Sequence, residues 1–336
     1  MASPPSGLRE ALPAGSGEGR GNPLHLLAIV GPTATGKTAL AVDVAHALGT
    51  EILSADSRQV YRGLDLGTGK DLEEYRRHSP AVPYHLIDIA DPREVYSLFH
   101  YQRDCYAVMD SLAQNLAASP VPLVLAGGTG LYMEAVLRKY RIANVPENAA
   151  LRAALSTRDH GDLAGELAHR DPELAGRTDL TSKKRVVRAL EIVAAARNHS
   201  SPLEYSRIPT WDFTFTLFCT TWERKDLRDR IDARLNLRLQ AGLVTEVEGL
   251  LAAGVSPERL KLLGMEYREI TAYLLGEKAY PAMIESLRHE IHLLAKRQET
   301  YFRGMRNRGL NVHWLPQGSG ASSVLEIWQR EKTAHA

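Results

Sequence analysis

Residues 31–38 read Gly31-Pro32-Thr33-Ala34-Thr35-Gly36-Lys37-Thr38, and this stretch decides the fold of the 336-residue chain. It matches the pattern G-x-x-x-x-G-K-[ST], a loop whose backbone N–H groups surround a di- or triphosphate. Lys37 adds a positive charge, and the Thr38 hydroxyl can hold Mg²⁺ at the start of the next helix. The motif predicts a strand before it, a helix after it and a phosphate ligand, but it does not specify which phosphate compound binds.

Apolar runs of strand length alternate with helix-length segments from residue 24 to about residue 137. The predicted strands are residues 24–30, 51–55, 84–89 and 121–126, and the predicted helices are residues 37–48 and 97–117. Short apolar strands separated by helices imply a parallel sheet with helices on both faces. Such sheets bind ligands at the carboxyl ends of their strands, where Gly31, Asp56 and Thr129 fall in this chain.

The pattern changes over residues 141–205, where strand signals vanish and Ala and charged residues dominate. We interpret this segment as an all-helical insertion, whose clearest helix begins after Thr181 or Ser182 and runs to about Arg197. A strand at residues 213–220 returns the chain to the sheet, and a long helix is predicted at residues 281–306. The predicted fold class is therefore α/β, a P-loop NTPase-like parallel sheet core with an inserted all-helical domain.

These changes in composition also set the predicted domain boundaries. The core comprises residues 24–140 and 206–316, and the insertion comprises residues 141–205. Residues 1–23 are rich in Gly, Pro, Ala and Ser, so we expect a disordered tail there. Residues 317–336 are expected to form a loosely ordered tail with one short helix at about residues 324–330.

The overall composition excludes several classes of protein. The net charge is +1, so any nucleic-acid binding must rest on local basic patches instead of a global basic field. Cys105 and Cys219 lack metal-ligand spacing, and we expect both to be buried thiols. No run approaches the roughly 20 apolar residues of a spanning helix, and residues 1–23 have no signal-peptide pattern. We therefore expect a cytoplasmic protein with no membrane partner.

Polar residues directly follow the predicted strand at residues 51–55. Asp56 could accept a proton from an incoming nucleophile there; capping a helix or holding Mg²⁺ through water are the alternatives. Arg58 and Gln59 have side chains suited to base edges, although such residues are also common on solvated loops. The segment is therefore a candidate for both proton transfer and recognition of a nucleobase.

Paired glycines, Gly127 and Gly128, close the predicted strand at residues 121–126. They allow a ligand to approach the backbone closely, and Thr129 then offers a hydroxyl; a simple helix-start turn is the alternative. An ATPase often carries a carboxylate at that place, and the nearest candidate here is Asp88. The chain is thus a poor match to a motor ATPase.

Two predicted helices carry basic stripes. The first stripe, in the insertion, consists of Lys183, Lys184, Arg185 and Arg188. The second stripe, on the long helix at residues 281–306, consists of His292, Lys296, Arg303 and Arg306. A single basic stripe is usually a solvated helix face, but two stripes beside one phosphate site favour a polyanionic partner.

Several stretches taken together resemble the bacterial tRNA dimethylallyltransferases. They are residues 31–38, 54–63, 67–70, 84–89, 123–132, 184–191, 295–298 and 302–303, which occur in the family's order between about residues 26 and 314. A phosphate loop alone is generic, whereas the loop followed by Asp-Ser-x-x-x-Tyr and Gly-Gly-Thr is specific to this group. One departure lies at residues 264–268, Gly-Met-Glu-Tyr-Arg, where the family commonly has Gly-Tyr-Arg.

The resemblance implies a prenyl-transferring enzyme that uses Mg²⁺. It would move a dimethylallyl group from dimethylallyl diphosphate to N6 of the adenosine next to the anticodon on its 3′ side in tRNA. The helical insertion would grip the anticodon stem-loop, and we expect a monomer. The acceptor base must leave its stack to reach such a site.

The same resemblance implies roles for individual residues. Asp56 would be the general base for the N6 proton, and Thr129 would lie beside the reacting amine. Thr38 would hold Mg²⁺, while Lys37 and Arg230 would neutralise the departing diphosphate. The implied diphosphate-binding residues are Gly31, Pro32, Thr33, Ala34, Thr35, Gly36, Lys37, Thr38 and Arg230. The implied tRNA-binding residues are Asp56, Ser57, Arg58, Gln59, Arg152, Lys184, Arg185, Val186, Val187, Arg188, Lys296 and Arg303.

Three alternatives share parts of this pattern. A small-molecule P-loop kinase would have the same loop and sheet. An adenylate isopentenyltransferase would use nearly the same catalytic residues on free AMP, although the helical insertion and the basic long helix favour tRNA. A nucleotide-dependent RNA-binding protein would bind both ligands and form no prenyl product.

Overall fold

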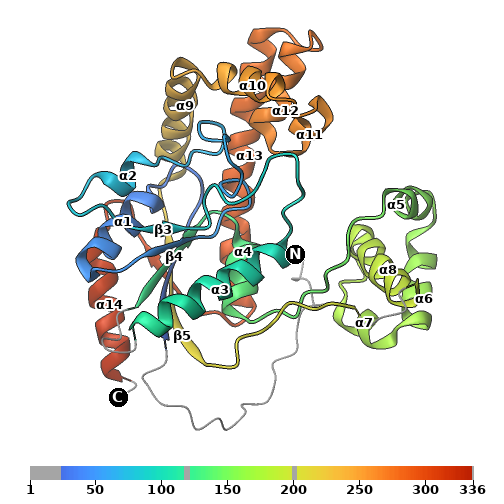
Figure 1. Cartoon of the computed structure of the whole chain (residues 1–336), viewed down its shortest axis with the longest axis horizontal. Coiled ribbons are helices and arrows are strands. Elements are labelled where there is room, and N and C mark those ends of the chain that lie inside the picture. The colour runs from blue at the N-terminus through green and yellow to red at the C-terminus, as the bar shows by residue number, and fades with distance from the viewer. Residues whose placement is uncertain (1–23, 117–121, 199–202, 335–336) are drawn as a thin grey trace. The chain divides into compact units, whose positions relative to one another are not determined.

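The computed structural model describes residues 24–116, 122–198 and 203–334 (Figure 1). The tail predicted at residues 1–23 lies outside this part of the chain. The described residues divide into two compact units. One unit contains residues 24–97, 107–116, 122–134 and 211–334, and the other contains residues 98–106, 135–198 and 203–210.

A six-stranded, all-parallel sheet forms the centre of the first unit. Its strands are β1 (Leu24–Val30), β2 (Ile52–Ser54), β3 (Tyr84–His85), β4 (Leu123–Gly127), β5 (Phe213–Thr220) and β6 (Val312–Leu315). They lie in the order β3-β2-β4-β1-β5-β6, so β2, β4 and β1 are neighbours and their carboxyl ends meet at one edge. The predicted parallel sheet is confirmed, and this edge is where ligands of such sheets bind.

Two strand predictions differ from the structure. The strand expected at residues 84–89 ends at His85, because Leu86 and Asp88 have positive φ values of 67° and 57° that interrupt an extended ladder. Strand β6 was not predicted, since its four residues are too short a run to stand out. It extends the sheet beside β5.

Helices α1 (Lys37–Leu48) and α14 (Ala321–Ala334) pack together and contribute to one core with the sheet (Figure 1). This core joins Ile29 and Val124 of the strands to Val44 of α1 and Val324 of α14, all completely buried. The expectation of a loosely ordered tail at residues 317–336 is therefore corrected. Most of that stretch is a helix, because Val324 buries its side chain against the core.

A second core of the same unit lies among its carboxyl-terminal helices. These are α9 (Arg224–Gln240), α10 (Leu243–Ala252), α11 (Pro257–Leu262), α12 (Met265–Leu274) and α13 (Tyr280–Asn307), and a short helix α2 (Glu73–Arg76) follows β2. Their buried side chains include Leu235, Leu260 and Leu287, and the loop after β2 adds Val60 and Leu64. The loop that follows Asp56 is thus anchored in the same core as α9 and α13.

The second unit is helical. Its helices α5 (Ala149–Ser156), α6 (His160–Arg170), α7 (Pro172–Arg177) and α8 (Lys183–Asn198) surround a small core of their own that includes Leu163 and Leu167. Side chains of Asn148, Asp159 and Asp171 accept hydrogen bonds from backbone N–H groups and so start α5, α6 and α7. Helices α3 (Leu98–Leu116) and α4 (Gly130–Leu137) each run from one unit into the other.

Two further expectations bear on location and chemistry. No helix within the described ranges is long and apolar enough to cross a bilayer. Cys105 and Cys219 are buried free thiols, as predicted, and burial raises the pKa of each to about 12.

Candidate active site

The phosphate loop between β1 and α1 has the backbone shape that its glycines predict. Gly36 has a φ of 82° and Ala34 a φ of 64°, so two residues lie in the left-handed region. The Thr35 hydroxyl donates to the Pro32 carbonyl over 2.8 Å. Gly31 packs against Thr220, and a Cβ at residue 31 would collide with the Thr220 hydroxyl. Contacts within the protein therefore set the conformation of the loop.

Residues of the later sequence hold this loop from outside. The indole of Trp222 donates to the Thr35 carbonyl over 3.1 Å, and Arg230 Nε donates to the Ala34 carbonyl over 2.9 Å. The guanidinium of Arg230 lies 4.2 Å above the Trp222 ring. Arg230 is thereby placed beside the phosphate loop.

Lys37 has the most perturbed charge of the loop. Its Nζ donates to the Pro32 carbonyl over 3.2 Å. Burial and, to a smaller extent, the Arg234 guanidinium lower the pKa of Lys37 to about 8, although the Asp56 carboxylate opposes both. A buried ammonium with so little compensation favours an anionic ligand.

Asp56 and Thr129 follow neighbouring strands and lie close together. Asp56 Oδ1 accepts hydrogen bonds from the backbone N–H of Arg58 at 2.9 Å and of Gln59 at 3.4 Å. Thr129 Oγ1 accepts from the backbone N–H of Ser57 at 3.1 Å. The turn fixes one oxygen of Asp56 and leaves Oδ2 without a hydrogen bond from any described residue.

Gly128 marks the point where the three segments converge. A Cβ built there would lie 3.4 Å from Lys37 Cε and 3.6 Å from Asp56 Oδ2. Gln298 of α13 joins two of the segments, because its Oε1 accepts from Thr33 N at 2.8 Å and its Nε2 donates to the Gly128 carbonyl at 2.9 Å. The loops after β1, β2 and β4 thus form one site.

A cavity of about 900 Å³ opens at this edge of the sheet. Its lining includes Lys37, Thr38, Asp56 and Thr129. The cationic residues of the lining are Lys37, Arg58, Arg230, Arg234, Arg238, Lys261, Arg268 and Arg297, against the acidic Asp56, Asp71, Glu74, Glu266 and Glu290. This excess of cations suits a ligand that carries several negative charges.

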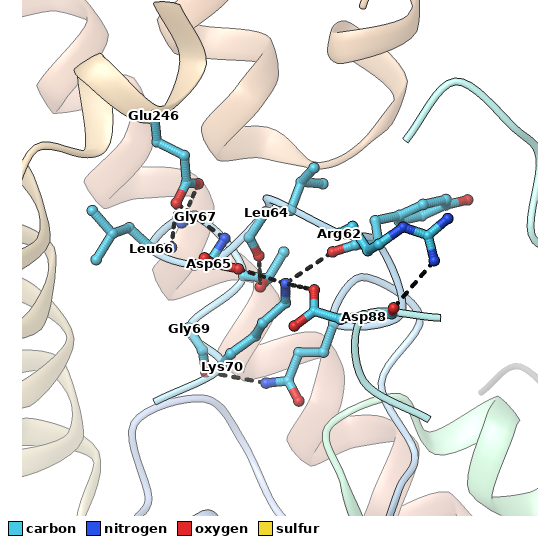
Figure 2. A network of polar contacts seen from close by, with 12 residues as sticks. Arg62, Leu64, Asp65, Leu66, Gly67, Gly69, Lys70, Asp88 and Glu246 are labelled. Atoms are coloured by element: carbon cyan, nitrogen blue, oxygen red, sulfur yellow. Dashed lines mark hydrogen bonds and ion pairs between the residues drawn. The ribbon is translucent and has the colours of Figure 1, made fainter. Parts of the chain in front are cut away.

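A network of polar contacts holds the loop at residues 64–71, which forms one wall of the cavity (Figure 2). Lys70, with a side chain that is 1% exposed, donates to Asp65 at 2.6 Å, to the Tyr61 carbonyl at 2.9 Å and to Asp88. Asp88 therefore serves here as a counter-ion of Lys70. On the other side of the loop, Glu246 of α10 accepts from three successive backbone N–H groups, those of residues 65–67. Two charged anchors thus fix the wall.

Comparison with known proteins identifies the family of the chain. Residues 59–305 match the protein family described as "IPP transferase", and residues 24–78 match the one described as "Isopentenyl transferase". The chain is 44% identical over 290 residues to "tRNA dimethylallyltransferase 2" of Bacteroides fragilis, covering 86% of this chain and 92% of that protein. It is 45% identical over 296 residues to "tRNA dimethylallyltransferase 1" of Geotalea uraniireducens, covering 88% and 93%. The chain belongs to the tRNA dimethylallyltransferase family.

A solved structure of a related protein has a similar fold. The full-length tRNA isopentenylpyrophosphate transferase of Bacillus halodurans is 30% identical, with a TM-score of 0.64, and the match covers 93% of this chain and 99% of that one. Membership of the tRNA dimethylallyltransferase family excludes the small-molecule kinase.

The site of this tRNA dimethylallyltransferase family member fits Mg²⁺ bound mainly through its substrate. Thr38 lines the cavity, and its hydroxyl makes no hydrogen bond to another described residue. Across the described ranges, no cluster of three or more His, Cys, Asp or Glu could hold a metal by itself. Mg²⁺ usually keeps several waters and takes one or two protein ligands together with phosphate oxygens. A single hydroxyl beside a diphosphate provides such a ligand set.

The predicted tRNA-binding residues fall into three groups. Asp56, Ser57, Arg58 and Gln59 line the cavity. Gln59 also donates to the Gly69 carbonyl over 3.1 Å, and Arg58 to the Leu262 carbonyl over 3.0 Å. Lys296 and Arg303 are exposed on α13 outside the cavity lining, and Arg303 pairs with Glu299 at 2.5 Å. The third group belongs to the insertion.

Most predicted contact residues of the insertion have partners inside it. Arg152 makes two hydrogen bonds to Glu191, at 2.8 and 2.7 Å, and Arg188 binds the same carboxylate at 3.0 Å. Arg185 pairs with Asp179. Lys184 is exposed and has no ion pair within the part of the chain that the structure describes.

The two predicted valine contacts need a correction. The Val186 side chain is completely buried and that of Val187 is 9% exposed, because both face the core of the insertion. Their side chains pack against the other helices and offer no surface to a ligand in this conformation.

Three residues of the cavity were missed by the sequence interpretation. Gln298 lies in the predicted helix at residues 281–306 and was given no role, although a lone amide among the Leu and Ile residues of one helix face was the available signal. Arg234 and Arg238 repeat the spacing of four residues that starts at Arg230. This spacing places three arginines on one face of α9.

Proposed function

We propose that this chain transfers a dimethylallyl group from dimethylallyl diphosphate to N6 of the adenosine on the 3′ side of the anticodon in tRNA, giving N6-isopentenyladenosine. The observation that carries the proposal is the convergence of Lys37, the phosphate loop and Asp56 around Gly128 in one cavity. Membership of the tRNA dimethylallyltransferase family supports the donor and the acceptor.

The phosphate loop and its cations act on the leaving group. As the bond between the allylic carbon and the diphosphate oxygen breaks, the electron pair goes to the diphosphate. Backbone N–H groups of residues 34–38, the Lys37 ammonium and the terminal nitrogens of Arg230 stabilise that charge. Mg²⁺ beside Thr38 would supply further neutralisation of the diphosphate.

Asp56 acts on the acceptor. The amine nitrogen forms the new bond to the allylic carbon and loses a proton, which Asp56 Oδ2 accepts. Oδ1 stays hydrogen-bonded to the backbone N–H of Arg58 and Gln59, so the carboxylate keeps its orientation. Thr129 would lie beside the same amine, and its hydroxyl already holds the Ser57 segment in place.

The insertion supplies a candidate surface for RNA. Lys184 presents an exposed, unpaired charge on α8, and Arg152, Arg185 and Arg188 keep part of their side chains exposed beside their carboxylate partners. Recognition of a folded stem-loop depends mainly on shape and phosphate contacts. We propose that this surface, without the buried side chains of Val186 and Val187, binds the anticodon stem-loop. We also propose that the protein acts as a monomer.

Product analysis tests the proposed function directly. Purified protein is incubated with dimethylallyl diphosphate, Mg²⁺ and unmodified tRNA, with AMP as a competing acceptor, and the nucleosides are identified by mass spectrometry. We expect isopentenyladenosine in the tRNA and unmodified AMP. Prenylated AMP would favour the adenylate isopentenyltransferase alternative, and binding without any prenyl product would contradict the enzyme.

A further inference from the structure

Three arginines on one face of α9 line the cavity: Arg230, Arg234 and Arg238. Because an α-helix rises 1.5 Å per residue, this row is about 12 Å long. Arg230 touches the phosphate loop, and Arg234 is close enough to influence the charge of Lys37. Arg238 lies two helical turns beyond Arg230, next to Arg234 and Asp71. It therefore lies beyond the place where the loop holds a diphosphate.

Arg238 has no adequate partner among the described residues. Its side chain is 15% exposed, and it makes no hydrogen bond to any described residue. Nη2 is buried and unsatisfied, and the nearest carboxylate oxygen, Asp71 Oδ1, is 3.9 Å away. Burial together with repulsion from Arg234 lowers the pKa of Arg238 to about 10. A guanidinium left in this state is costly unless a ligand supplies acceptors.

Two guanidiniums share one carboxylate at this place. Arg234 takes the Asp71 carboxylate directly, so Arg238 is left with the weaker contact. Both guanidiniums rest against Gly69, where a Cβ would collide with Arg238 Nη2 and lie 2.5 Å from Arg234 Nη2. The other acid near Arg238 is Glu266, which forms no hydrogen bond or ion pair with it among the described residues. One positive charge therefore remains uncompensated.

The wall under these arginines is built to stay in place. The Gly69 carbonyl accepts from Gln59 Nε2 at 3.1 Å, and the adjacent Lys70 is anchored by Asp65, Asp88 and the Tyr61 carbonyl (Figure 2). A rigid wall holds the two guanidiniums in position before any ligand arrives. Such preorganisation favours specific binding of an anion.

We propose that Arg238, with Arg234 over Gly69, binds a phosphodiester group of the acceptor RNA strand close to the nucleoside that is modified. The subsite rests on the proposed function, since it assumes an RNA acceptor. A backbone phosphate fits better than the donor diphosphate because Arg238 lies two helical turns from Arg230. Arg58, one of the predicted base contacts, lies on the same side, as it influences Glu266 together with Arg238.

The test compares Arg238→Met with Arg228→Met. Methionine keeps most of the length and apolar volume of arginine and removes the charge. Arg228 lies on the same helix, is exposed and does not line the cavity, so it is a matched control. Steady-state kinetics are measured with an anticodon stem-loop RNA and dimethylallyl diphosphate. We expect Arg238→Met to raise KM for RNA about tenfold, as loss of a hydrogen bond to a charged group does, with KM for the donor unchanged.

Three further measurements extend the test, and two of them, the methylphosphonate scan of the wild-type protein and the Asp71→Asn variant, do not require a stable Arg238→Met. The slope of log affinity for RNA against log salt should fall by about 0.7–0.9 when one phosphate contact is lost. In the wild-type protein, a single methylphosphonate near the target adenosine should weaken binding at one position, and Arg238→Met should be insensitive to it. Asp71→Asn should strengthen RNA binding, because it frees both guanidiniums.

The outcomes separate the subsite from the proposed function. If the wild-type protein modifies no RNA at all, the proposed function fails. If it is active but no methylphosphonate position matters and Asp71→Asn does not tighten binding, the subsite is wrong. A rise in KM for the donor alone would also overturn it, since Arg238 would then serve the diphosphate.

Discussion

Cations in the active-site cavity and cations in the helical insertion have opposite surroundings. In the cavity, Lys37 and Arg238 are buried with little or no compensation from carboxylates. In the insertion, Arg152 and Arg188 share the Glu191 carboxylate, which is 1% exposed. A buried charge without a partner lowers the stability of the folded protein and favours binding of an oppositely charged ligand. A paired charge contributes to the stability of the fold. The number of Arg and Lys residues in a segment therefore says little about how strongly that segment attracts an anion.

The largest expected effect concerns Asp56, the carboxylate among the cavity cations. Asp56→Asn keeps the side-chain size and an oxygen acceptor for the Arg58 N–H but cannot take a proton. We expect the single-turnover rate to fall by about 10²–10⁴, the usual contribution of a positioned base. Binding of inorganic diphosphate serves as the control and should persist. An unchanged rate would remove Asp56 from the mechanism.

The pH dependence of diphosphate binding tests whether Lys37 is uncompensated. With a pKa of about 8 in the free protein, Lys37 loses its proton above that pH, whereas a bound anion raises its pKa. Affinity for diphosphate should therefore fall about tenfold per pH unit above pH 8, and binding should take up a proton. Calorimetry in buffers of different ionisation enthalpy measures that uptake. Lys37→Met should bind weakly and show no such proton uptake.

The stability of the insertion tests whether its paired cations contribute to the fold. Glu191→Gln removes the charge shared by Arg152 and Arg188, and we expect it to destabilise the insertion by about 1–3 kcal/mol. Hydrogen exchange of amides in α8 measures the loss. Glu147→Gln is the matched control, because Glu147 also pairs with Arg152, at 2.7 Å, but is 72% exposed. Exposed pairs contribute less than about 1 kcal/mol.

The same carboxyl has a definite pH dependence. Burial alone would raise the pKa of Glu191, but hydrogen bonds from Arg152, the Asn148 N–H and Arg188 bring it below its usual 4.5. A lowered pKa in the folded state stabilises the fold above pH 4.5, and this contribution disappears as the pH falls through the folded-state value. The difference in the free energy of unfolding between the wild type and Glu191→Gln should become smaller at acidic pH. A constant difference from pH 7 to pH 3 would contradict this role.

The smallest expected effect is at Lys184, the exposed cation of α8. Lys184→Gln should weaken binding of the stem-loop RNA by only a few-fold, in line with the roughly 0.2–1 kcal/mol of exposed charge pairs. It should also lower the salt dependence of RNA binding without changing the protection of α8 amides from hydrogen exchange. Arg197→Gln, at the other end of α8, is the control. If both variants bind RNA like the wild type, this face of the insertion does not contact the phosphates.

Much of the architecture was predictable from local sequence. The strands at residues 24–30 and 213–220 and the helix at residues 37–48 have the predicted bounds. Each is a long apolar, alternating or periodic run, so neighbouring residues alone specify it. Strand β3 and helix α14 were predicted poorly: positive φ values end the first early, and contacts distant in sequence stabilise the second.

The sequence by itself determined the phosphate loop, the α/β class and the candidate base Asp56, because these depend on residues adjacent in the chain. Only the tertiary structure decided that Gln298 bridges two loops 95 residues apart, from Thr33 to Gly128. It also decided which cations are open to a ligand, since Arg152 and Arg238 have the same side chain and differ only in their neighbours. Pairing and burial are properties of packing between distant segments, and no local pattern encodes them.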